Sequence, residues 1–274
     1  MNIAFVGGGN MATALIGGLV AKGADPRDFR VVEPLPAQQD RLTGRFPGIG
    51  IFGEPTEGAV AGADLVVMAV KPQQMRAAAM ALAPGVADVP VVLSIAAGTR
   101  IADLARWLGG YTRIVRAIPN TPALIGAGIS GVYATADVTD GSRRLATRVL
   151  EAAGAVLWVE REDLLDAVTG VSGSGPAYVF YFLEGLEEAA QAMGFAHADA
   201  RLLAYATFAG AVKLAQASDL APHVLRAQVT SKGGTTERAL AVLEAGAVKA
   251  KFVAAVQAAA ERAREMGDEF GREP

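Results

Sequence analysis

Cysteine is absent from the 274 residues of this chain, and histidine occurs only at His197 and His223. The lack of cysteine excludes disulfides, thiol catalysis and zinc–cysteine sites. Two histidines are too few for a histidine-rich metal centre, so we predict no metal. Each is better interpreted as a surface or capping residue than as a catalytic acid. A reducing cytoplasm is compatible with this composition.

Strong charge and long apolar runs are also missing. The net charge of −3 gives no electrostatic reason to expect a nucleic-acid partner. No apolar run reaches the roughly 18 residues that a membrane span requires, and the chain opens without a basic leader segment. We therefore expect a cytoplasmic protein without a membrane partner. With 52% hydrophobic residues the chain is globular, with one large domain or two of ordinary size.

Glycine, by contrast, is abundant and carries a motif at the start of the chain. A short apolar strand at residues 2–6 leads into Gly7-Gly-Gly-Asn-Met-Ala12 and then an apolar helix. Gly7, Gly9 and Ala12 have the spacing of a dinucleotide-binding fingerprint. Gly7 would allow a tight turn, Gly9 a close approach of a pyrophosphate, and Ala12 close helix–strand packing. The motif indicates a Rossmann-type domain.

The next predicted strand, residues 29–33, ends on the acid Glu33. It stands at about the spacing from the glycines at which a carboxylate binds the cofactor ribose. Such a carboxylate accepts hydrogen bonds from a 2′-hydroxyl and repels a 2′-phosphate. No arginine stands beside it, so the sequence mildly favours NADH over NADPH. The alternative is a solvent-exposed acid at a strand end.

Strands and helices then alternate as far as about residue 160. Apolar runs at 63–70, 90–95 and 113–118 are typical of buried parallel strands. Small, proline and amide residues follow each run, at the sheet edge where open α/β sheets bind ligands. With segments 128–133, 141–152 and 156–159, they predict a doubly wound sheet domain over residues 1–160.

The second half predicts a helical domain over residues 161–274. We expect helices at 164–169, from Pro176, at 198–217, at 222–229, from Glu237 and at 248–266. Their apolar surfaces suit a domain core or a subunit interface. Ser172–Tyr178 and Thr230–Thr236 are predicted loops rich in glycine and hydroxyls, each opening a helix and offering N–H groups to a small carboxylate. For the first, the alternative is an ordinary serine-capped helix entry.

These features together predict a nicotinamide-dependent reductase of a small, carboxylate-bearing electrophile. Hydride transfer needs no cysteine, histidine or metal, because the cofactor carries the chemistry and the protein supplies position and polarity.

Six segments of the chain resemble pyrroline-5-carboxylate reductases in the same order: 3–12, 69–73, 94–98, 119–122, 166–178 and 228–236. The last two are far more specific than the glycine motif. The resemblance implies hydride transfer from NAD(P)H to the C=N carbon of 1-pyrroline-5-carboxylate, giving L-proline in the last step of proline synthesis. It also implies an intertwined helical dimerisation domain, with a homodimer as the minimal unit and larger rings, up to a decamer of dimers.

The resemblance implies site residues as well. Substrate would be bound by Ser231, Gly234, Thr235 and Thr236, with Ser174, Glu162 and Gln228 as further candidates. Thr236 and Ser231 are the catalytic candidates, because a hydroxyl near the ring nitrogen can help to supply a proton. The cofactor-binding residues would be Val6, Gly7, Gly8, Gly9, Asn10, Met11, Ala69, Val70, Lys71, Pro72, Ala96, Ala97, Gly98 and Asn120. To these we add Glu33, from its spacing after the glycines, and Thr56, which occupies the position of a cofactor contact in the family.

Three residues depart from the family pattern. Lys232 stands where a proline is usual, and we interpret it as solvent-exposed. Thr56 stands where an asparagine often contacts the cofactor. Glu33 replaces a small or polar residue, which argues against assuming NADPH.

Two alternatives stay open. A reductase of another cyclic imine or keto acid, built like a short β-hydroxyacid dehydrogenase, would need a catalytic lysine beyond the sheet, and Lys213 has only apolar neighbours in sequence. A non-catalytic dinucleotide-binding protein is the other, but it would not need a second carboxylate site.

Overall fold

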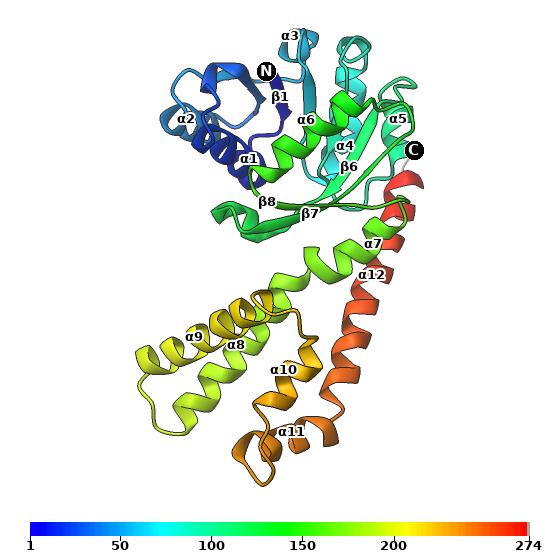
Figure 1. Ribbon diagram of the computed structural model, residues 1–274. Coiled ribbons are helices and arrows are strands. Elements are labelled where there is room, and N and C mark those ends of the chain that lie inside the picture. Colours follow the sequence, from blue (N-terminus) through cyan, green and yellow to red (C-terminus); the bar gives the residue numbers. More distant parts are fainter. Residues whose placement is uncertain (273–274) are drawn as a thin grey trace. The chain divides into compact units, whose positions relative to one another are not determined.

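The computed structural model describes residues 1–272, which form two compact units (Figure 1). The sheet unit comprises residues 1–174 together with the chain from Ala258 onward. The helical unit comprises Gly175–Gln257. This division by contacts differs from the predicted boundary at residue 160, because residues 161–174 and the end of the last helix pack with the sheet.

The sheet unit contains one eight-stranded sheet in the order β3-β2-β1-β4-β5-β6-β7-β8. Neighbouring strands are parallel except β6 and β7. Only the 3₁₀ turn Thr121–Ile125 joins those two, and a connection so short cannot provide the crossover that parallel pairing needs. The strands are β1 (Ile3–Val6), β2 (Phe29–Val32), β3 (Gly50–Phe52), β4 (Leu65–Met68), β5 (Val92–Ser94), β6 (Ile114–Ile118), β7 (Gly128–Ala134) and β8 (Gly154–Trp158).

Seven α-helices complete the sheet unit up to the π-helix described below. They are α1 (Asn10–Ala21), α2 (Pro36–Arg45), α3 (Glu57–Val60), α4 (Pro72–Leu82), α5 (Ile101–Trp107), α6 (Asp140–Glu151) and α7 (Leu164–Val168). Sequence analysis missed β3, α2 and α3. They are short, and α2 is largely polar, so hydrophobic periodicity marks them weakly.

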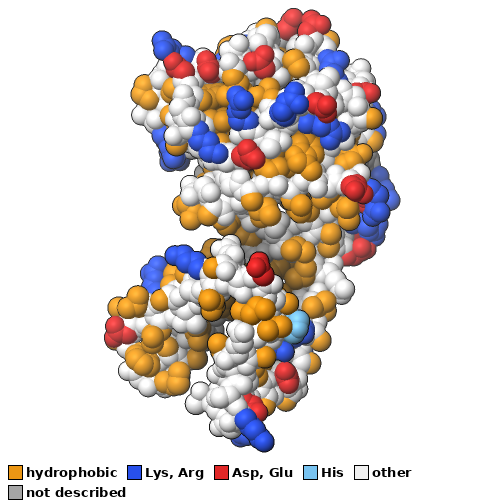
Figure 2. Space-filling model, viewed as in Figure 1, with side chains coloured by type: hydrophobic (Ala, Val, Ile, Leu, Met, Phe, Trp, Pro, Cys, Tyr) orange, Lys and Arg blue, Asp and Glu red, His pale blue; other side chains and the backbone are white. Residues whose placement is uncertain are grey.

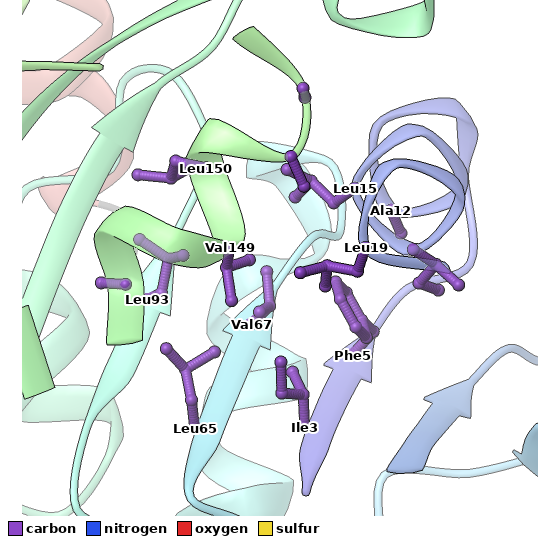
Figure 3. Packing of buried hydrophobic residues seen from close by; sticks show 14 of the residues in the cluster. Ile3, Phe5, Ala12, Leu15, Leu19, Leu65, Val67, Leu93, Val149 and Leu150 are labelled. Carbon is purple, nitrogen blue, oxygen red and sulfur yellow. The ribbon is translucent and has the colours of Figure 1, made fainter. Parts of the chain in front are cut away.

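Helices cover both faces of the sheet, as in a doubly wound fold. Successive strand residues point to opposite faces, so Phe5 joins a core under α1, α2 and α6, whereas Val6 joins one under α3, α4 and α5. Figure 3 shows the first of these cores, in which Leu15 and Leu19 of α1 lie with Val149 of α6 over the central strands. The predicted sheet fold is confirmed.

The segment 169–174 is helical, which corrects the predicted loop at Ser172–Tyr178. A π-helix spans Thr169–Gly173, and α8 (Gly175–Ala192) begins one residue before Pro176. The Ser174 N–H donates to the Thr169 carbonyl at 2.8 Å. The hydroxyls of Thr169 and Ser172 donate to the Leu165 and Val168 carbonyls. The backbone hydrogen bond continues the helical pattern into α8, so the predicted anion-binding loop does not form here.

The helical unit contains α8, the three helices that follow it and the part of the last helix that ends at Gln257. Its first two helices pack side by side as an antiparallel pair (Figure 1). The helix predicted to begin at Glu237 begins at Thr235, so Thr235 and Thr236 lie in its first turn. The remaining helices are α9 (His197–Gln216), α10 (Pro222–Gln228), α11 (Thr235–Ala245) and α12 (Val248–Arg272).

The last turns of α12 pack against α5 and against the turn that precedes it in the sheet unit. Arg106 donates to the Gly271 carbonyl at 3.1 Å. Gly98 has a φ of 72°, and a Cβ on it would lie 2.9 Å from the Phe270 ring. Glycine is therefore required at position 98 both by its backbone conformation and by this close approach.

Candidate active site

The glycine-rich turn after β1 has the geometry of a dinucleotide cradle. Gly7 has a φ of 103°, its N–H donates to the Val32 carbonyl at 2.9 Å, and a Cβ on it would lie 2.8 Å from the Ala69 carbonyl oxygen. On Gly9, by contrast, a Cβ would meet no non-neighbouring atom of the described chain within 4 Å. The turn is therefore closed toward the protein at Gly7 and open at Gly9.

Helix α1 presents its positive end at this opening. Gly9 is the N-cap, and within residues 1–272 no side chain caps the helix and no acid lies in its first turn. Asn10 and Met11 form that first turn. Uncapped N–H groups at a helix N-terminus suit a pyrophosphate. The residues present thus fit a nicotinamide dinucleotide.

The Glu33 side chain lies behind this turn and is nearly buried, with 7% exposed. Its Oε2 accepts a hydrogen bond from the Gly8 N–H at 3.1 Å, and its Oε1 accepts one from the Leu35 N–H at 2.9 Å. Gln38 donates to the Gly8 carbonyl at 2.5 Å. Glu33 is therefore not the solvent-exposed acid of the alternative interpretation, and it supports the glycine turn directly.

The other predicted cofactor residues in the sheet unit follow strands at one edge of the sheet. Ala69 and Val70 come after β4, and Lys71 is the exposed N-cap of α4, with Pro72 in its first turn. Ala96–Gly98 follow β5 and lead into α5. Thr56 lies after β3 as the exposed N-cap of α3.

Asn120, at the end of β6, makes two hydrogen bonds within the sheet unit. Its Oδ1 accepts from the Ile129 N–H at 2.9 Å, and its Nδ2 donates to the Ser172 carbonyl at 3.0 Å. The amide therefore links β6, β7 and the π-helix. Ser174, another predicted site residue, is half-buried with helical dihedral angles at the junction with α8.

A cluster of opposite charges lies beside the Ala96–Gly98 turn, and sequence analysis missed most of it. Arg116 of β6 pairs with Glu162 at 2.8 Å, and Arg100 pairs with Asp166 at 2.9 Å. Arg116 is 1% exposed. The signal in the sequence was Arg116, an arginine flanked on both sides by apolar residues within the run 113–118. The predicted substrate residue Glu162 is instead bonded within the sheet unit.

The second hydroxyl-rich segment forms a loop that ends at an uncapped helix. Gly233 has a φ of 72°, and Gly234 is the N-cap of α11, with no side-chain cap among the described residues. Glu237, an acid in the first turn of α11, accepts a hydrogen bond from the Gly233 N–H at 2.7 Å through its Oε2. A Cβ on Gly234 would overlap the Ser231 hydroxyl. As first-turn groups, the N–H groups of Thr235 and Thr236 have no partner within the helix, which suits a carboxylate.

Side chains around this loop differ in exposure. Thr236 is half-buried, whereas Ser231 and Thr235 are exposed. Lys232 is exposed, as interpreted from the sequence. Gln228 ends α10 and is also exposed.

The Rossmann-type sheet has an open glycine turn, and a helical unit follows it in the same chain. Together they define a nicotinamide-dependent oxidoreductase. Two family models match the chain: the coenzyme F420-dependent NADP oxidoreductase model over residues 2–98, and the pyrroline-5-carboxylate reductase dimerisation model over residues 162–266.

Curated relatives carry the same name over nearly the full length of the chain. A pyrroline-5-carboxylate reductase of Pseudomonas aeruginosa is 42% identical and covers 98% of both chains, and one of Arabidopsis thaliana is 35% identical over 96% of this chain and 95% of its own. The chain belongs to the pyrroline-5-carboxylate reductase family. It is an oxidoreductase that reduces 1-pyrroline-5-carboxylate to L-proline with NAD(P)H, as predicted.

Solved structures agree with this assignment. A pyrroline-5-carboxylate reductase from Coxiella burnetii has a TM-score of 0.90 at 38% identity and covers 97% of this chain and 98% of its own. The Plasmodium falciparum enzyme, solved with NADP bound, has a TM-score of 0.87 at 26% identity, with the same coverage. Within residues 1–272, every helix is too short or too polar to cross a bilayer.

Proposed function

We propose that the uncapped N-termini of α1 and α11 bind different molecules: the first binds the cofactor and the second binds the substrate. The α1 turn binds the cofactor pyrophosphate with Val6–Met11, and the turns at Ala69–Pro72 and Ala96–Gly98 complete the cofactor site. The loop before α11 binds the substrate carboxylate with Ser231, Gly234 and Thr235. The observation that carries this proposal is that each helix has a glycine N-cap without a side-chain cap and a positive-φ glycine within two residues before it, although α11 also carries Glu237 in its first turn.

When bound, the cofactor supplies the hydride that adds to the C=N carbon. We assign to Thr236 a hydrogen bond at the ring nitrogen. A half-buried hydroxyl in the first turn of α11 can hold that nitrogen and relay a proton from water. No ionisable side chain with a shifted pKa is needed, because a protonated imine is already activated toward hydride.

NADH is the proposed preferred cofactor. The Glu33 carboxylate at the end of β2 lies against Gly8, where a 2′-phosphate would meet a buried negative charge. Because the Plasmodium relative was solved with NADP bound, we expect the preference to vary within the family and to depend on residues such as Glu33.

The chain forms a homo-oligomer, and we propose the homodimer as its minimal unit, assembled into larger rings in the cytoplasm. Hydrophobic side chains are exposed in patches over the helical unit (Figure 2). Phe180, Tyr181 and Leu202 are among them, and the dimerisation family model covers this region. Light scattering coupled to gel filtration would measure the assembly, and a monomer at micromolar concentration would contradict the dimer.

A spectrophotometric assay tests the proposed preference and the reaction together. Purified protein is mixed with 1-pyrroline-5-carboxylate and either NADH or NADPH, and loss of reduced-nicotinamide absorbance is followed alongside proline formation. We expect stoichiometric proline with both cofactors and a larger kcat/KM for NADH. A larger kcat/KM for NADPH would contradict the role proposed for Glu33. No oxidation by folded protein would contradict the activity.

A further inference from the structure

The guanidinium of Arg116 is a buried charge that needs compensation. Arg116 lies in the middle of β6 and is 1% exposed. A charge so far from water is strongly unfavourable unless it is paired and hydrogen-bonded. Its nearest partner is Glu162 Oε1 at 2.8 Å, and Asp166 Oδ1 lies at 3.8 Å.

Glu162 performs a second task with the same oxygen. Its Oε1 accepts a hydrogen bond from the Ile101 N–H at 2.9 Å. Ile101 is the first residue of α5, whose own N-cap residue, Arg100, gives no side-chain cap among the described residues. A carboxylate at this position satisfies a free N–H and favours the positive end of the helix. Glu162 thus caps α5 from a distant part of the chain.

Arg100, the residue before α5, makes a second ion pair in the same region. Its Nη1 pairs with Asp166 Oδ2 at 2.9 Å, and both side chains are largely buried. The two arginines pair with Glu162 and Asp166, and Asp268 of α12 lies 4.0 Å from Arg100 as a third acid. This set holds the start of α5, and the turn Ala96–Gly98 precedes that start by two residues. The direction of the turn is therefore determined by where α5 begins.

We propose that Glu162 is a positioning residue for the cofactor: through Arg116 and the Ile101 N–H, it holds the Ala96–Gly98 turn in its binding conformation. This inference rests on the proposed function in one respect, the assignment of that turn to the cofactor. It replaces the substrate-binding role predicted from the sequence. The Glu162 carboxylate already accepts hydrogen bonds from the Arg116 guanidinium and the Ile101 N–H, so its role is to position the protein backbone.

The test separates cofactor affinity from substrate affinity in the full-length protein. Glu162→Gln keeps an acceptor for Ile101 but removes the charge, and Glu162→Ala removes both. Glu160→Gln, at an exposed neighbouring acid, is the control. The Kd for NADH and NADPH is measured by fluorescence titration without substrate. The KM for 1-pyrroline-5-carboxylate is measured at saturating cofactor.

We expect the Kd for both cofactors to rise about tenfold or more in Glu162→Ala and less in Glu162→Gln, with the substrate KM within about twofold of wild type. A raised substrate KM with unchanged cofactor Kd would overturn the proposal. If the proposed function itself were wrong, the wild-type protein would oxidise neither NADH nor NADPH, which is a different result from a changed Kd or KM in a variant.

Removing Glu162 alone leaves the buried Arg116 charge without its nearest partner and could prevent folding. The charge-balanced double variant Arg116→Met with Glu162→Gln avoids this, since the amide oxygen introduced by the second substitution still reaches the Ile101 N–H. Positioning predicts that this variant binds cofactor more tightly than Glu162→Ala does. A substrate role predicts no such recovery and a substrate KM that stays high, which would again overturn the proposal.

Discussion

The buried carboxylate of Glu33 accepts a hydrogen bond from the Gly8 N–H at 3.1 Å, so the end of β2 supports the glycine turn that follows β1. Replacing Glu33 by Gln keeps the size and removes the charge, but it leaves one acceptor oxygen for the two N–H groups of Gly8 and Leu35. We expect the ratio of kcat/KM for NADPH to that for NADH to rise several-fold, because a 2′-phosphate no longer meets a carboxylate. Steady-state kinetics with both cofactors measures this ratio.

Glu54→Gln is the matched control, since Glu54 is exposed in the neighbouring loop and should leave the ratio unchanged. An unchanged ratio in Glu33→Gln as well would mean that Glu33 serves the turn alone and not the choice of cofactor.

Two glycines of one turn should respond differently to alanine. At Gly7 a Cβ collides with the Ala69 carbonyl at a φ of 103°, so Gly7→Ala should cost more than about 2 kcal/mol of unfolding free energy. At Gly9 the space is open and φ is −67°, so Gly9→Ala should cost less than about 1 kcal/mol.

Cofactor binding completes that comparison. Gly9→Ala places a methyl group where the pyrophosphate approaches, and we expect the cofactor Kd to rise at least about tenfold. Urea unfolding and fluorescence titration provide the two measurements. Equal affinity in wild type and Gly9→Ala would show that the cofactor does not approach the backbone there.

Thr236→Ala should lower kcat about a hundredfold while the dinucleotide Kd stays within about twofold, because the hydroxyl acts on substrate and not on cofactor. Thr230→Ala is the control: its hydroxyl already donates to the Arg226 carbonyl at 2.6 Å inside the same loop. Full turnover in Thr236→Ala would remove this residue from the mechanism.

Tyr111 gives a prediction about stability and pH. Its hydroxyl donates to the Val89 carbonyl at 2.8 Å, and Arg113 donates to the same oxygen at 2.9 Å. Tyr111→Phe therefore leaves that acceptor satisfied, and we expect a loss of only about 0.5–1 kcal/mol in urea unfolding at pH 7.

Burial raises the pKa of Tyr111 above its ordinary value of 10.0, although Arg113 opposes the shift. A group with a raised folded-state pKa contributes stability below its unfolded pKa and loses it as the pH rises through the folded one. The advantage of wild type over Tyr111→Phe should therefore shrink above pH 10. A constant difference between pH 7 and pH 11 would contradict this reading of the burial.

The glycine turn after β1 and the strands other than β3 could be predicted because each depends on a local pattern. The run at 63–70 is apolar and bounded by Lys71-Pro72, and the strand β4 lies within it. Gly7 is required by its positive φ, and the glycine-rich motif around it already indicates a tight turn. Such features need no knowledge of distant parts of the chain.

The remaining features depend on which distant groups meet. The pattern around Ser172 suggests a loop, yet the backbone forms a π-helix there, in which the Ser174 N–H donates to the Thr169 carbonyl and the Ser172 and Thr169 hydroxyls bond back to earlier carbonyls. Likewise, Glu33 could have faced solvent, ribose or backbone, and only the fold brings it to Gly8. The pairing of Arg116 with Glu162 joins residues that no local pattern connects.

Helix α12 leaves the helical unit at Gln257 and finishes in the sheet unit, where Phe270 lies against Gly98 and Gly271 against α5. A protein chain emerges from the ribosome N-terminus first, and N-terminal domains commonly fold before the rest is made. The sheet unit begins at the N-terminus but is completed last, because α5 makes its contacts with the final turns of α12. An expressed fragment ending at Ser174 would lack that closing contact, so the sheet unit cannot be isolated intact by a single cut.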